Sequence, residues 1–179
     1  MLANDRVKLR AVEPEDLEKL YKWENDTTLW DVGNTRQPYS KFALKQYIDN
    51  VDKNIYESGQ LRFMIVEQVG NETVGTVDLF DLDIHNSRIA LGLFVEKHFQ
   101  GRGLAKSALS LIEDYVFSFL HLNQLYCHIS ASNVLSRKIF ENQHYMNTGL
   151  LKNWIRTANG FEDVIVFQQF RQEVIEYNN

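Results

Sequence analysis

The sequence of 179 residues has one cysteine, two prolines and no apolar run long enough to span a membrane. A single cysteine, Cys127, excludes an internal disulfide framework, and its apolar surroundings favour a buried, unreactive thiol. His121 and His128 lie seven residues apart on different predicted elements, so they lack the spacing of metal ligands. We therefore expect no metal and no membrane contact. We also expect a cytoplasmic location, because the N-terminus lacks a secretory or transit pattern.

Acidic residues outnumber basic ones by 24 to 19, which gives a formal net charge of −5. This balance disfavours nucleic acid as a partner and is compatible with a cationic substrate. The length predicts one domain over residues 1–179 with a core at about 5–171, and no repeat or linker interrupts it. A homo-oligomer is one expected form of the chain.

The spacing of apolar residues predicts a mixed α/β fold. Strands are expected at 5–11, 61–69, 73–82, 87–95, 124–130, 145–157 and 161–170, and helices at 13–25, from 40 onward, at 103–120 and at 133–143. This order indicates a single, mostly antiparallel sheet with helices on both faces. Only the crossover from strand 87–95 through helix 103–120 to strand 124–130 needs a parallel pair, which we expect to be right-handed.

The most informative segment is residues 99–109, where a predicted buried strand passes into a helix. Gly101 and Gly103 can adopt positive φ there, and Arg102 and Lys106 add positive charge. Unpaired N–H groups and the helix dipole make such a helix N-terminus an anion site, although an ordinary strand-to-helix turn remains the alternative. The segment fits neither a P-loop nor the three-glycine dinucleotide pattern.

Gln100, Gly103 and Ala105 form the pattern Gln-x-x-Gly-x-Ala, which resembles the acyl-CoA pyrophosphate loop of the GNAT superfamily of N-acetyltransferases. The resemblance extends from residue 6 to about 170. It includes the opening strand and helix at 7–17 and the segment 133–136, which is similar to the family's second cofactor motif. The branch containing ribosomal-protein alanine acetyltransferases and spermidine acetyltransferase is the most similar. The resemblance implies a GNAT-type fold in which strands 87–95 and 124–130 separate to admit the pantetheine arm of acetyl-CoA.

The resemblance also implies which residues bind the cofactor: Phe94, Val95, Gln100, Gly101, Arg102, Gly103, Leu104, Ala105, Lys106, Ser107 and Asn133. Backbone N–H groups near Phe94 and Val95 are the implied donors to the oxyanion, with Val95 preferred. The alternative is that these groups simply pair within the sheet. Asn133 contacts the pantetheine, caps the following helix, or does both.

Acetyl transfer to an amine needs a neutral amine, an oxyanion donor and a proton for the leaving thiolate. Phe140 occupies the position where many members of this family have a tyrosine acid, so that role is vacant. Ser136, one helical turn earlier, takes the place of the serine that approaches the CoA sulfur in the alanine branch, with a purely structural hydroxyl as the alternative. Asp78 and Asp81 are the candidate carboxylates for the amine. Their odd spacing allows at most one to face a given cleft, and solvent exposure is the alternative for each.

Trp30, Asn34 and Tyr39 are expected to form part of the acceptor wall. Residues 33–37 are neutral to basic, whereas the resemblance implies an acidic cluster at this place in spermidine acetyltransferases. Peptide N-termini and small amines are therefore preferred to polyamines as the expected acceptors. The leading hypothesis is thus an acetyl-CoA-dependent N-acetyltransferase acting on a primary amine. A CoA-binding module with little or no catalysis is the alternative, and a dinucleotide enzyme is a more distant one.

Overall fold

The computed structural model describes residues 2–30, 35–50, 54–157 and 159–172. Its strands are β1 (Leu2–Ala3), β2 (Val7–Ala11), β3 (Leu61–Glu67), β4 (Glu72–Asp83), β5 (Arg88–Val95), β6 (Gln124–Ser130), β7 (Met146–Thr157) and β8 (Gly160–Phe170). Its helices are α1 (Leu17–Glu24), α3 (Lys41–Asp49), α4 (Ile55–Ser58), α5 (Leu104–Asp114) and α6 (Val134–Asn142). Short 3₁₀ turns span Pro14–Asp16 and Lys97–Phe99, and a π-helical turn at Tyr115–Phe119 continues α5.

The strands form one sheet in the order β1-β2-β3-β4-β5-β6-β8-β7. Every neighbouring pair is antiparallel except β5 and β6, which run parallel and are connected through α5. The predicted fold class is confirmed, and each predicted strand and helix is present with small shifts at its ends. β1 and α4 are additional elements that the apolar pattern did not indicate. Within the described residues, no helix has the length and apolar character that crossing a membrane requires.

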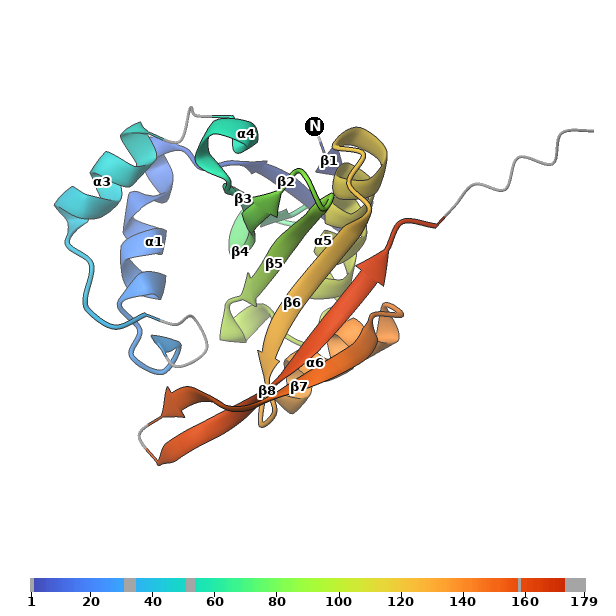
Figure 1. Cartoon of the computed structure of the whole chain (residues 1–179). Helices are drawn as coiled ribbons and strands as arrows, with labels where there is room; N and C mark the ends of the chain where they lie inside the picture. Colours follow the sequence, from blue (N-terminus) through green and yellow to red (C-terminus); the bar gives the residue numbers. More distant parts are fainter. Residues whose placement is uncertain (1, 31–34, 51–53, 158, 173–179) are drawn as a thin grey trace, which may run out of the picture.

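Helices cover both faces of the sheet (Figure 1). On one face α1 and α3 enclose a small core with the β2–β4 strands, formed by Val12, Leu20, Trp23, Leu44, Ile48 and Met64. On the other face α5 and α6 cover a larger core that includes Leu79, Leu91, Leu109, Ile112, Leu125, Phe140 and Phe167. The two layers fix the sheet between them, so that its middle strands are held on both sides.

Short polar caps define where the helices begin. The Oγ of Ser40 accepts a hydrogen bond from the N–H of Ala43 at 3.0 Å, which starts α3 as the sequence predicts. Asn54 caps α4 in the same way, and Gly59 ends that helix in the left-handed region at φ +67°. α3 packs into the small core beside β2–β4, whereas Ile55 of α4 packs into the larger core with α5.

Two irregularities in the sheet decide which side chains share a face. The register between β3 and β4 shifts at Ile65 and Val66. The register between β4 and β5 shifts between Phe80 and Asp83, where Asp81 has φ +52°. Each bulge moves the residues beyond it by one place relative to the partner strand, and so to the other face.

Candidate active site

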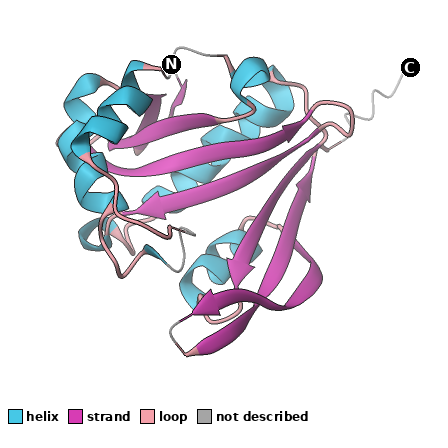
Figure 2. Ribbon diagram, turned by 60° about the vertical axis from the view of Figure 1, so that its left-hand side comes forward, coloured by secondary structure: helices cyan, strands magenta, loops and turns pink. Residues whose placement is uncertain are grey.

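The sheet opens between β5 and β6, as the family resemblance implied. The two strands pair only from Arg88 with Gln124 to Ala90 with Tyr126. Beyond that point β5 stays with β4 up to Val95, whereas β6 follows β8 up to Ser130. Figure 2 shows the wedge between the two halves of the sheet. A cavity of about 1500 Å³ occupies this region and reaches the inner sides of α1, α3 and α6.

Backbone direction at the edge of the opening follows from one hydrogen bond. The N–H of Glu96 donates to the carbonyl of Val74 at 2.8 Å, so the even-numbered residues of β5 point their amides toward β4. Successive residues of an antiparallel strand alternate, and the N–H groups of Leu93 and Val95 therefore face the opening. The N–H of Phe94 faces β4 instead, while its ring lines the cavity and meets Trp23 edge to face at 5.2 Å.

The loop after β5 is tied back to the strand end. The Nε2 of Gln100 donates to the carbonyl of Val95 at 2.9 Å. Gly101 and Gly103 have φ of +77° and +79°, as the motif predicts, and Gly103 directly precedes α5. No side chain caps this helix, and its first intrahelical bond runs from the N–H of Ser107 to the carbonyl of Gly103. The N–H groups of residues 101–106 therefore have no hydrogen-bond partner in the part of the chain that the structure describes, which is the arrangement that binds an anion.

Arg102 and Lys106, the basic residues of the loop, differ in what they contact. The Nη1 of Arg102 lies 3.3 Å from Glu67, its guanidinium stacks over Phe99, and its carbonyl accepts from Arg6. These contacts hold the backbone of the loop in place. Lys106 is exposed on the first turn of α5, where its ammonium can approach an anion at the helix N-terminus. Leu104 is buried and anchors α5 in the core, and Ala105 is half-buried beside it.

The α6 segment supplies the far side of the opening. The Oδ1 of Asn133 accepts a hydrogen bond from the N–H of Ser136 at 3.1 Å, so Asn133 caps the helix while still lining the cavity. Ser136 also lines the cavity, one turn before Phe140. The ring of Phe140 is buried edge to face against Tyr145, with centroids 4.9 Å apart. Of these groups on α6, the hydroxyl of Ser136 is the one able to donate a proton.

An ion-pair cluster lies on the side of the cavity where the acceptor wall is expected, which is called the acceptor side below. The Nε of Arg62 lies 2.5 Å from Asp78, its Nη1 lies 2.6 Å from Glu24, and Thr76 donates to Asp78 at 3.3 Å. The carboxylate of Asp78 lines the cavity, which agrees with the expectation that at most one of the two aspartates would face it, and it is ion-paired with Arg62. Asp81 is exposed on the β4 bulge and does not line the cavity.

Two of the three predicted wall residues line the cavity. The Nε1 of Trp30 donates to the carbonyl of Glu24 at 2.9 Å, which fixes the indole next to the ion-pair cluster. Tyr39 lines the same cavity, and its N–H is held by Asn25. Asn34 lies outside the described residues.

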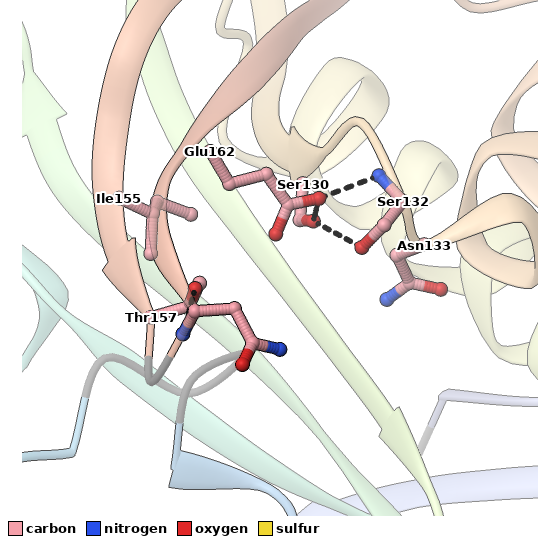
Figure 3. Close-up of a pocket in the computed structure, with 7 residues that line it drawn as sticks. Ser130, Ser132, Asn133, Ile155, Thr157 and Glu162 are labelled. Atoms are coloured by element: carbon pink, nitrogen blue, oxygen red, sulfur yellow. Dashed lines mark hydrogen bonds between the residues drawn. The ribbon is translucent and has the colours of Figure 1, made fainter.

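A smaller polar pocket of about 250 Å³ adjoins the opening between the start of α6 and the β7–β8 hairpin (Figure 3). The Oε1 of Glu162 accepts from the hydroxyl of Ser130 at 2.6 Å and from the N–H of Ser132 at 2.7 Å. These hydrogen bonds lower the pKa of Glu162, because they stabilise its charged form. Ile155 lines this pocket and the large cavity alike.

Three further residues line the large cavity that were not expected at the site: Arg62, Glu24 and His128. The signal that could have found Arg62 is its place on a strand opposite Asp78. That pairing depends on a bulge which periodicity does not reveal. The described residues contain no group of three or more His, Cys, Asp or Glu side chains placed to hold a metal ion.

A sheet that opens beside an uncapped helix N-terminus is suited to a long ligand with an anionic end. The chain belongs to the GNAT acetyltransferases, since residues 6–145 match the family described as an acetyltransferase (GNAT) domain. It is 24% identical over 172 residues to the uncharacterized N-acetyltransferase p20 of Bacillus licheniformis, covering 96% of this chain and 97% of that one. It is 24% identical over 161 residues to the spermidine N(1)-acetyltransferase of Vibrio cholerae, covering 90% and 91% of the two chains.

Similarity of fold extends over almost the whole chain. The crystal structure of Vibrio cholerae spermidine N-acetyltransferase in complex with CoA and spermine superposes with a TM-score of 0.84 at 21% identity. The alignment covers 94% of this chain and 97% of that one. The family and the N-acetyltransferase class expected from the motifs are therefore confirmed.

Proposed function

We propose that this enzyme transfers the acetyl group of acetyl-CoA to a primary amine by direct attack within a ternary complex. The observation that carries the proposal is the junction of two features at one edge. The N–H of Val95 faces the opening between β5 and β6, and the unpaired N–H groups of residues 101–106 follow directly along the chain. Acetyl-CoA carries both a thioester and a diphosphate. Its thioester would lie at the N–H of Val95, and its diphosphate would lie at the N–H groups of residues 101–106.

The diphosphate is bound by the loop at Gln100–Ser107. Glycines at 101 and 103 leave space for close approach, because a Cβ at Gly101 would meet no atom within 4 Å. The N–H groups and the dipole of α5 supply the positive potential, and the ammonium of Lys106 adds to it. Asn133 contributes from the other side of the opening, where its amide lines the cavity.

The reaction needs no covalent enzyme intermediate. Acetyl-CoA supplies an activated acyl group whose carbonyl oxygen becomes negative when the amine attacks. The N–H of Val95 points toward the opening and can donate to this oxyanion. The hydroxyl of Ser136 can donate to the departing thiolate, a role that the phenyl ring of Phe140 cannot perform.

The acceptor is a primary amine without a high positive charge, such as a peptide N-terminus or a small amine. Glu24 and Asp78 would attract a polycation, but both are ion-paired with Arg62, which offsets one of their two negative charges. Trp30 and Tyr39 add an amphipathic aromatic wall that suits a largely uncharged acceptor. We therefore expect polyamines, such as the spermine in the Vibrio cholerae complex, to be poorer acceptors for this chain than peptide N-termini or small amines. Assembly into a homo-oligomer remains a prediction.

Steady-state kinetics with a panel of amines tests the proposal. Thiol release from acetyl-CoA is followed with peptides bearing free N-termini, with small monoamines, with spermidine and with aminoglycosides. Saturable turnover with a peptide or monoamine, and acetylated product in a mass spectrum, is the expected result. Saturable CoA binding without thiol release from any acceptor would instead support a binding module. Initial rates with both substrates varied should give intersecting lines, because a ternary complex forms before transfer.

A further inference from the structure

His128 occupies a central place in the opening and has no part in the proposed transfer as described so far. It lies on β6 two residues after Tyr126, the last residue of that strand to pair with β5. Side chains two apart share a face of a strand, so His128 and Tyr126 are on the same side of the sheet. Carrying the register two residues further sets His128 level with Gly92, which has no side chain to cover it. The imidazole accordingly lines the large cavity.

Asp78 reaches the same region from the other direction. It pairs with Gly92 across β4 and β5, so Gly92 lies between Asp78 and His128. The space above Gly92 is bordered by Asp78 and by the ring of Phe80, each 3.6 Å from where a Cβ of residue 92 would lie, and His128 lines the same cavity. An amine that attacks a thioester held between β5 and β6 from this side of the cavity would lie close to this space.

Asp78, Glu24 and Tyr126 are poorly suited to accept a proton. Asp78 and Glu24 are both engaged by Arg62, and proton binding by either would break an ion pair of 2.5 or 2.6 Å. Burial raises the pKa of Tyr126, which keeps its hydroxyl protonated. The imidazole nitrogens of His128 have no hydrogen-bond partner within the described residues.

The surroundings of His128 favour the neutral ring. Partial burial lowers its pKa, and the negative charge of Asp81 on β4 opposes this only in part. The ring of Tyr126 meets the imidazole edge to face at 5.7 Å. β8 pairs beside it through Val166, which carries no charge, and β5 contributes Gly92. A neutral imidazole at neutral pH is the form that can accept a proton.

We propose that the imidazole of His128 is the general base that takes a proton from the acceptor ammonium before or during its attack on the thioester. This inference rests on the proposed N-acetyltransferase function. The ammonium nitrogen loses two protons in total. One passes to His128 and then to solvent. The other leaves nitrogen after the C–N bond has formed, and it ends on the sulfur of the thiolate released when the C–S bond breaks.

His128→Gln tests the inference, with His85→Gln as the matched control because His85 is exposed in the β4–β5 turn and lies outside the cavity. Two acceptors of similar size are compared at pH 7, one a strongly basic amine and one so weakly basic that it is already neutral. His128→Gln should lower kcat about 100-fold for the basic amine and less than about threefold for the neutral one. The affinity for acetyl-CoA and the unfolding temperature should stay at wild-type values.

A pH profile supplies a second readout. The acid limb of kcat, which falls below the usual pKa of histidine in the wild type, should disappear in His128→Gln. Added imidazole should partly restore turnover to His128→Ala, which a structural role would not permit. Equal losses for both amines, or kcat within twofold of wild type for the basic amine, would overturn the inference while leaving the proposed function intact. Absence of acetyl transfer by the wild-type enzyme to any amine would overturn both.

Discussion

Arg62 on β3 and Asp78 on β4 lie directly opposite each other, with the Nε of Arg62 2.5 Å from the carboxylate. The same guanidinium reaches Glu24 on α1 at 2.6 Å and lies over the ring of Tyr47. Burial opposes the charge of Arg62, but the carboxylates of Asp78 and Glu24 outweigh it and raise the pKa of the guanidinium. The acceptor side of the cavity thus presents one fixed cation between two acids.

This arrangement predicts a change of specificity in Arg62→Gln. Two unpaired carboxylates would then face the cavity and attract a polycation. The ratio of kcat/KM for spermidine to that for a monoamine should rise about tenfold, or roughly 1.4 kcal/mol. The variant should also be less stable by about 2 kcal/mol, since an ion pair of partly buried groups loses one partner.

Arg88→Gln is the matched control, because Arg88 pairs with Asp83 at 3.0 Å at the far end of β5 and does not line the cavity. It should leave the spermidine ratio unchanged. An unchanged ratio in Arg62→Gln as well would show that Arg62 has no influence on acceptor charge.

Gly101→Glu tests the anion site. The substitution puts a carboxylate beside the unpaired N–H groups, and it should weaken acetyl-CoA binding at least 100-fold in a calorimetric titration. Gly70→Glu in the β3–β4 turn is the control. Both glycines have positive φ, and a Cβ at either would meet no atom within 4 Å, so the backbone strain of the two substitutions is similar. Equal affinity in the two variants would contradict the assignment of the loop.

Ser136→Ala should lower kcat about tenfold and change the KM for acetyl-CoA less than threefold. The physical reason is that a proton donor to the thiolate acts in the transition state and not in the ground state. Ser110→Ala on the exposed side of α5 provides the comparison at equal helix propensity. Wild-type turnover in Ser136→Ala would return Ser136 to a structural role.

Glu113 on α5 makes stability depend on pH. Burial raises its pKa to about 7, and the nearby Tyr145 hydroxyl opposes the rise only in part. A carboxyl with a raised native pKa binds protons more tightly in the folded state. The folded state therefore loses stability as the pH rises from about 4.5 to about 7, and the loss is complete above that window.

Glu113→Gln removes this penalty. At pH 8 the variant should exceed the wild type by about 1 kcal/mol in urea unfolding, a modest figure because the carboxyl is only partly shielded from water. At pH 4 the two proteins should be equal. Glu15→Gln, at an exposed position, should show no such difference. A constant gap between Glu113→Gln and wild type across this range would refute the pH linkage.

The loop at residues 99–107 could be predicted from the sequence because its chemistry is local. Gly101 and Gly103 need positive φ, and a helix follows, so the unpaired N–H groups are a consequence of adjacent residues. The same holds for Asn133, whose capping bond reaches only three residues ahead. Such features depend on the chain order alone.

The acceptor side could not be predicted in the same way, because it depends on register. Counting back from the β3–β4 turn, where Glu67 pairs with Glu72, would set Arg62 opposite Val77. The bulge at Ile65 and Val66 moves the pairing by one residue and sets Arg62 opposite Asp78 instead. The bulge beyond Phe80 likewise takes Asp81 out of simple alternation. For His128, the sequence indicates only that its spacing from His121 does not suit a metal site. No local pattern indicates that β6 separates from β5 before it reaches His128.

Residue-resolved amide hydrogen exchange, with and without acetyl-CoA, tests the central assignment most directly. The N–H groups of residues 101–106 should exchange at least ten times more slowly when acetyl-CoA is bound, while those of the β4–β5 turn at 84–87 should not change. Unaltered exchange at 101–106, together with protection at some other surface in the same bound sample, would contradict the account.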